Sequence, residues 1–139
     1  MTISYLAKGS TLSYFIVSHQ FSYSFPNDIY TYNRAFLRFD LSSESLVLEQ
    51  IASVKLFIYP YYFYGGGVSA ILTSAISTNS NWGTSLNATI GDFRSTNAQT
   101  EDTLNLTSSG YTSFNIDKNN LDLSGWNWYR IKDVNEGSA

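Results

Sequence analysis

Polar and apolar residues alternate along much of this chain with a period of two, which is the spacing of half-buried β-strands. In the run 35–41, one face carries Ala35, Leu37, Phe39 and Leu41, and the other face carries Phe36, Arg38 and Asp40. The alternation predicts about eight short strands among nine candidate segments, which are 2–6, 12–18, 20–25, 35–41, 54–59, 68–76, 103–106, 111–116 and 126–131.

Turn-forming residues separate these segments, and helical periodicity is almost absent. The one helical candidate is 43–51, where Ser43 would be the cap, although Leu46-Val47-Leu48 equally fits an inter-strand crossing. Because strands do not alternate with helices, an α/β fold is excluded. Many short strands in a chain of this length predict an antiparallel β-sandwich or a small barrel, with residues 1–139 as one domain.

Composition narrows the class of protein further. The chain is 43% hydrophobic and 17% aromatic but only 14% charged, so it has the material for a core and is not disordered. Its net charge is −3 and it has no basic cluster, which argues against a nucleic-acid partner. Ser, Thr and Asn make up about a third of the residues, and Cys is absent. A surface of uncharged polar groups favours an extracellular, cell-surface or virion protein.

The ends of the sequence and its apolar runs bear on export. The segment 1–10 has no basic region followed by an apolar run, so we expect no signal peptide in this chain. The apolar stretch 56–64 is too short and too rich in Tyr to predict a membrane span. We therefore expect either a trimmed chain or a protein that leaves the cell within a particle.

The segment 33–42, Asn-Arg-Ala-Phe-Leu-Arg-Phe-Asp-Leu-Ser, followed by Ile-Ala-Ser-Val-Lys-Leu-Phe-Ile-Tyr at 51–59, resembles the DNRLRE-type jelly-roll modules, which include the family 96 carbohydrate-binding modules. The resemblance continues in order through 81–83, 110–116 and 126–133. It implies a non-catalytic β-sandwich of jelly-roll type. In such modules a further strand follows the position of Asp133, and its loss would leave an open sheet edge for a neighbouring chain.

The segment 59–67 is the first candidate contact surface. It carries five aromatic residues, Tyr59, Tyr61, Tyr62, Phe63 and Tyr64, followed by three glycines, and Pro60 interrupts the strand. Consecutive aromatic side chains cannot all point inward from a strand, so some are expected at the surface. Such rings can stack on sugars, contact a neighbouring subunit, or cap the end of the core, and the sequence leaves these three alternatives open.

The tryptophans are the second candidate. Trp126 and Trp128 share one strand face, and Tyr129 and Ile131 share the other. Because Trp is highly buried on average, we expect the two tryptophans in the core and Tyr129 outside; the alternative is an outward row of two Trp rings. Trp82 lies in an expected loop. Its ring would either stack on a ligand or anchor the loop on the sandwich.

Catalytic and metal chemistry has little support in the sequence. The single His19 has no partner at a recognisable spacing, and Arg38 with Asp40 is interpreted as a structural ion pair. Asp92, Asp117 and Asp122 are weak candidates for a structural calcium, with Asp/Asn-rich turns as the ordinary explanation. We expect no other cofactor and no enzyme.

From these features we predict a non-catalytic extracellular or virion-surface module. It would assemble with neighbouring subunits, as a homo-oligomer or within a virion or filament, or bind polysaccharide through its exposed aromatics. A free-standing carbohydrate-binding module is the alternative, and a polysaccharide-active enzyme is a more distant one.

Overall fold

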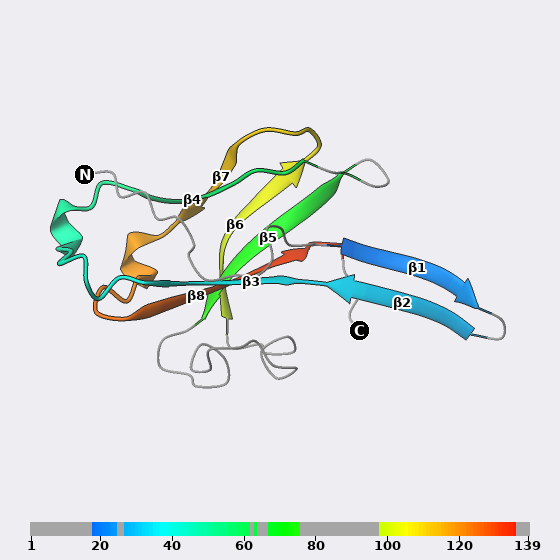
Figure 1. Cartoon of the computed structure of the whole chain (residues 1–139), viewed down its shortest axis with the longest axis horizontal. Helices are drawn as coiled ribbons and strands as arrows, with labels where there is room; N and C mark the ends of the chain where they lie inside the picture. Colours follow the sequence, from blue (N-terminus) through cyan, green and yellow to red (C-terminus); the bar gives the residue numbers. More distant parts are fainter. Residues whose placement is uncertain (1–17, 25–26, 62, 64–66, 76–97, 136–139) are drawn as a thin grey trace.

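The computed structural model of the chain describes residues 18–24, 27–61, 63, 67–75 and 98–135. These residues form antiparallel strands and two single turns of 3₁₀ helix, η1 (Leu48–Gln50) and η2 (Lys118–Asn120) (Figure 1). The strands are β1 (Ser18–Ser24), β2 (Asn27–Asn33), β3 (Ala35–Asp40), β4 (Val54–Ile58), β5 (Val68–Ala75), β6 (Ala98–Leu106), β7 (Thr112–Ile116) and β8 (Trp126–Asp133). The prediction of an all-β protein is confirmed.

Individual strands match the sequence pattern unevenly. Strands near 20, 35, 54, 68, 111 and 126 are confirmed, and η1 is all that forms in the helical candidate 43–51. The pattern missed β2, whose terminal Asn and Asp residues disfavour strands although its central Ile-Tyr-Thr-Tyr favours them; β2 pairs with β1 along its length. The pattern also placed the start of β6 five residues too late. The predicted strand at 2–6 and nearly all of the one at 12–18 lie outside the described residues.

The pairing of the strands is nested along the chain. β3 pairs with β8, β4 with β7, and β5 with β6, all antiparallel. β5 also pairs with β8, which gives a four-stranded sheet in the order β3-β8-β5-β6, beside the two-stranded sheets β4-β7 and β1-β2. The chain therefore resembles a long hairpin whose two arms pair and then roll up, so that β5 comes to lie beside β8.

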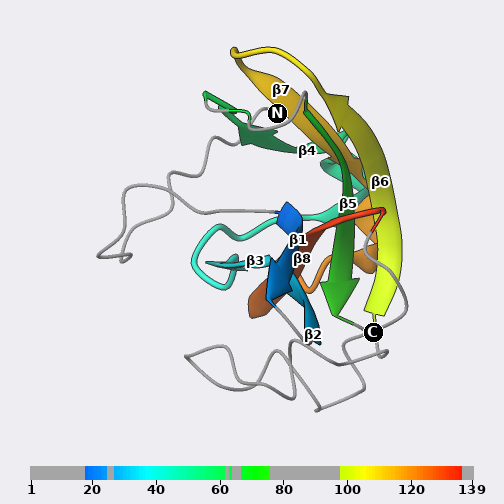
Figure 2. The ribbon, with the colours of Figure 1, turned by 90° about the vertical axis from the view of Figure 1, so that its right-hand side faces the viewer.

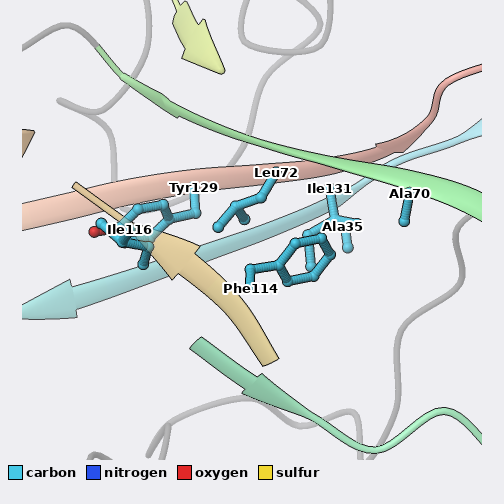
Figure 3. Packing of buried hydrophobic residues seen from close by; sticks show 7 residues of the cluster. All are labelled: Ala35, Ala70, Leu72, Phe114, Ile116, Tyr129 and Ile131. Atoms are coloured by element: carbon cyan, nitrogen blue, oxygen red, sulfur yellow. The ribbon is translucent and has the colours of Figure 1, made fainter. Parts of the chain in front are cut away.

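The core lies between the four-stranded sheet and the β4-β7 pair, which gives the protein its β-sandwich character (Figure 2). The side chains of Phe114 and Leu72 are fully buried, and Figure 3 shows Phe114 of β7 close to Ile131 and Ala35. The inward positions of β4, which are Val54, Leu56 and Ile58, pack against this cluster. Alternation along β4 thus supplies one apolar face to its layer of the sandwich.

A β-bulge shapes the outer end of the four-stranded sheet. Leu72 pairs with Asp102 and Thr73 with Thr100, so Glu101 has no opposite residue on β5. The extra residue allows both Glu101 and Asp102 to reach the neighbouring strand β7. The Asp102 carboxylate accepts the Asn115 amide at 2.7 Å, and the Glu101 carboxylate accepts the Asp117 amide at 3.0 Å. Carboxylates thereby tie β6 to β7.

The last described strand occupies the middle of its sheet. β8 lies between β3 and β5, and the Val134 amide continues its contact with β5 by donating to the Ser69 carbonyl at 2.7 Å. No strand follows Asp133 among the described residues. Among the described strands, β5 and β8 each pair with two neighbours, whereas β4 pairs with β7 alone, so the position that the sequence marked as a sheet edge lies beside a strand in the middle of its sheet.

Candidate binding surfaces

An exposed aromatic cluster lies at one end of the β4-β7 pair. We call it the tyrosine surface, and it consists of Phe57 (65% exposed), Tyr59 (53%), Tyr61 (61%) and Tyr111 (81%). Phe57 alternates with the inward Leu56 and Ile58, so it points away from the core. Tyr59 and Tyr61 follow the end of β4, and Tyr111 directly precedes β7. The register of β4 with β7 brings these two chain segments to the same end of the pair.

Hydrogen bonds between the two segments hold the tyrosine surface. The Gly110 amide donates to the Pro60 carbonyl at 3.2 Å, and the Ser109 hydroxyl donates to the Tyr61 carbonyl at 3.4 Å. Gly110 has a φ of 135°, a backbone conformation that side chains oppose, so the turn before Tyr111 requires glycine. The ring of Tyr111 meets the ring of Tyr59 edge to face, with centroids 4.8 Å apart. The cluster is therefore partly preorganised.

The chemistry of the tyrosine surface is that of a flat, weakly polar platform. A shallow pocket lined by residues 105–112 lies beside Tyr111 and offers hydroxyl, amide and carbonyl groups. Lys55 is the nearest ionisable group along β4 and is exposed. Rings with few charges around them are easily desolvated, so a neutral ligand surface can cover them at small cost.

The aromatic residues of segment 59–67 differ in their exposure. The exposure of Tyr59 and Tyr61 excludes the core-cap interpretation for these two residues, whereas Phe63 is half-buried. Tyr62 and Tyr64 lie outside the described residues. Sequence reasoning missed Phe57 and Tyr111. The signal was available for Phe57, because it alternates with the apolar residues Leu56 and Ile58; the place of Tyr111 beside Tyr59 depends on the register of β4 with β7.

The two tryptophans of β8, Trp126 and Trp128, lie on the outer face of the sheet. The prediction that they are in the core is wrong. Tyr129 is in the core at 4% exposure, while Trp126, at 45%, and Trp128 share the outer face of the sheet. The surrounding strands decide this, since Tyr129 and Ile131 lie on the core face beside Leu72 of the neighbouring strand β5 and opposite Phe114 of β7. Trp82 lies outside the described residues.

Arg38 lies over both tryptophan rings. Its guanidinium carbon is 4.7 Å from the ring centroid of Trp126 and 5.4 Å from that of Trp128, within cation–π range. The register of β3 with β8 places Arg38 directly opposite Trp128. Arg38 Nη1 and Trp128 Nε1 are buried without a hydrogen-bond partner in the described part of the chain. The predicted ion pair with Asp40 is not among the contacts that the structure records for Arg38.

Asp40 instead takes part in a turn. Its Oδ1 accepts the Ser42 backbone amide at 2.9 Å. This hydrogen bond, with a second one from the Ser42 side chain, favours the ionised form and lowers the pKa of Asp40 below 3.8. The residue therefore caps the end of β3, and no catalytic pairing with Arg38 is present among the described contacts.

The described calcium candidates, Asp117 and Asp122, also accept hydrogen bonds within turns. Asp117 Oδ1 accepts the Asn119 amide at 2.9 Å and caps η2, and Asp122 Oδ1 accepts the Ser124 amide at 3.0 Å. Asp92 lies outside the described residues. The described part of the chain brings together no group of three or more metal-ligating acidic, His or Cys side chains. The side chain of His19, on β1, is outside the described set.

Comparison with known proteins finds no match to this chain among protein-family models, curated proteins or solved structures. The resemblance to jelly-roll modules therefore rests on the residues quoted above alone. Within the residues that the structure describes, no helix is long and apolar enough to cross a lipid bilayer.

Proposed function

We propose that this protein is a non-catalytic β-sandwich module that binds carbohydrate through the tyrosine surface, displayed outside the cell or on a virion. The observation that carries the proposal is a set of four aromatic side chains, each 53–81% exposed, at one end of the β4-β7 pair, with the rings of Tyr59 and Tyr111 in edge-to-face contact. Isolated exposed aromatics are common, but a cluster built by two separate chain segments and held by hydrogen bonds is a feature of binding sites.

Carbohydrate suits this surface because of the groups that it offers. Aromatic faces pack on the C–H groups of a sugar ring, and tyrosine hydroxyls can hydrogen-bond to sugar hydroxyls. The pocket at 105–112 adds polar backbone groups next to Tyr111. Few charged residues surround the site, which favours a neutral ligand over a highly charged one.

The strand connections support the jelly-roll topology that we propose for the fold. Nested antiparallel pairing of β3 with β8, β4 with β7 and β5 with β6, followed by rolling of the ribbon, is the arrangement by which a jelly roll forms two sheets. This topology and the sequence resemblance at 33–59 both favour a binding module. Whether the module is free-standing or part of a virion, cell surface or filament is a question of its partners.

The proposal is tested by affinity electrophoresis of the purified chain through gels that contain neutral polysaccharides, together with a glycan array. We expect retardation by at least one glycan class. Tyr59→Ala and Tyr111→Ala should each weaken binding about tenfold, which corresponds to about 1.4 kcal/mol. Both side chains are largely exposed, so the fold is retained.

Trp126→Ala is the matched control, because it removes an exposed aromatic side chain from the other surface. Loss of binding in the Trp126 variant and not in the tyrosine variants would move the site to the outer face of β8. Absence of retardation by every glycan, with no signal on the array, would refute carbohydrate binding.

A further inference from the structure

The outer edge of β4 is open among the described residues. β4 pairs with β7 on one side and has no described strand on the other. β7, by contrast, is contacted along both edges, because the carboxylates of Asp102 and Glu101 bind its second edge. Figure 2 shows β7 between β4 and β6. An unpaired strand edge presents amide and carbonyl groups that another strand can bind.

The hydrogen bonds of β7 determine which backbone groups of β4 point outward. The Asn115 and Asp117 amides point to β6, so the alternate residue Phe114 directs its backbone groups to β4. Phe114 is opposite Leu56 in the register. Leu56 therefore bonds inward to β7, and the flanking residues Lys55 and Phe57 direct their amides and carbonyls to the open edge.

We propose that two copies of this chain pair along this edge, with their β4 strands antiparallel and Leu56 of one copy opposite Leu56 of the other. In this register, Lys55 lies opposite Phe57 of the second copy. Both of these residues have outward backbone groups, so they exchange the hydrogen bonds that an antiparallel ladder requires. The contact is isologous and closes after two copies, as expected for a two-fold axis. The result is a continuous four-stranded sheet, β7-β4-β4-β7.

The side chains match on both faces of the paired strands. On the inward face, Leu56 meets Leu56, and Val54 meets Ile58, so each apolar layer continues into its neighbour. On the outward face, the Lys55 ammonium lies next to the Phe57 ring of the second copy, where a cation–π contact forms. Phe57 is 65% exposed in the single chain, which leaves its ring available for this contact.

Other registers are less favourable. If one β4 strand is shifted by one residue along the other, residues with outward backbone groups lie opposite residues with inward ones. The hydrogen bonds between the two strands are then lost. If the two-fold axis passes through Lys55 instead of Leu56, the Lys55 ammonium groups of the two copies lie opposite each other and repel. If the two-fold axis passes through Phe57, Val54 has no β4 residue of the second copy opposite it. The centred register is therefore the one that pairs all five residues of β4 without like-charge repulsion.

The test is sedimentation velocity of the full chain over a wide concentration range, with hydrogen exchange of the β4 amides measured in parallel. We expect a monomer–dimer equilibrium and concentration-dependent protection of the Lys55 and Phe57 amides. Phe57→Lys places a lysine opposite Lys55 of the second copy and should weaken dimerisation at least tenfold. The double variant Lys55→Glu, Phe57→Lys places opposite charges together and should restore it.

The two proposals for this protein can fail separately. Tyr111→Ala alters the tyrosine surface and leaves the β4 edge intact, so it should lower carbohydrate binding without changing dimerisation. Three outcomes would overturn the β4 pairing: a monomer at every concentration, a dimer unaffected by Phe57→Lys, or a double variant that stays as weak as Phe57→Lys. Circular dichroism of each variant confirms that the exposed substitutions leave the fold intact.

Discussion

The carboxylate of Asp102 binds the backbone of Asn115 across the boundary between β6 and β7, with Oδ2 2.7 Å from the amide nitrogen. Its Oδ1 accepts the next amide of its own strand, that of Thr103, at 2.8 Å. A side chain thus takes the place of the backbone carbonyl that a neighbouring strand would offer. The bulge at Glu101 is the cause, because it turns two successive side chains towards β7.

Replacement of Asp102 should loosen this boundary. In Asp102→Ala the Asn115 amide loses its charged acceptor, and we expect the free energy of unfolding to fall by roughly 1.5 to 3 kcal/mol. Urea denaturation followed by circular dichroism measures the change. Asp102→Asn retains an oxygen acceptor and should cost less than the alanine variant; equal losses for the two would show that the hydrogen bond is not the cause.

Asn127 stabilises the turn that precedes β8. Its buried side chain accepts the Asp122 amide at 2.8 Å and donates to the Asp122 carbonyl at 2.8 Å and the Gly125 carbonyl at 3.2 Å. Asn127→Ala should lower the free energy of unfolding by about 2 kcal/mol, because these backbone groups lose their partner. Ser124→Ala, in the same turn but exposed, should change it by less than about 0.5 kcal/mol. Similar values in urea denaturation would contradict this role.

Tyr129 should make the protein sensitive to alkali. Burial, with a smaller contribution from the nearby charge of Glu101, raises the pKa of Tyr129 far above its ordinary value of 10.0. In the unfolded chain the group ionises near pH 10, while in the folded protein it stays neutral. Its contribution to stability is therefore constant below pH 10 and falls above it, by up to about 1.4 kcal/mol per pH unit.

The measurement is the urea midpoint of the wild type and of Tyr129→Phe between pH 8 and pH 11. We expect the wild type to lose stability more steeply above pH 10 than the variant, which lacks the ionising group. Other tyrosines titrate in both proteins and cancel in the comparison. Parallel curves would show that Tyr129 ionises equally in the folded and unfolded states.

Arg38 and the two tryptophans form a stacked unit whose geometry depends on a planar cation. Arg38→Lys keeps the charge but not the plane, so we expect a loss of roughly 0.5 to 1 kcal/mol and a changed near-ultraviolet dichroism of the indoles. A double-mutant cycle with Trp128→Phe isolates the coupling. Additive effects of the two substitutions would contradict the proposed contact.

The choice of face on β8 shows the limit of sequence reasoning here. The pattern Trp-Asn-Trp-Tyr-Arg-Ile at 126–131 has large side chains on both faces, so alternation predicts a strand but not its orientation. Average burial of Trp favoured the wrong face. The packing of Tyr129 and Ile131 between two sheets settles the orientation, and Arg38 of the adjacent strand β3, which is distant in the sequence, makes the outward tryptophans favourable.

The sequence by itself determined the all-β class and the two faces of β3, because along 35–41 the apolar residues Ala35, Leu37, Phe39 and Leu41 alternate with Phe36, Arg38 and Asp40. It also indicated an exposed aromatic segment near Tyr59, since consecutive rings cannot all enter one core. The tertiary structure alone decided that Tyr111 joins Tyr59, that Glu101 is a bulge, and that β8 lies in the middle of its sheet while β4 pairs with a single strand among the described residues. These features depend on strand register and sheet order, which arise from contacts between residues far apart in the chain, and local patterns do not encode them.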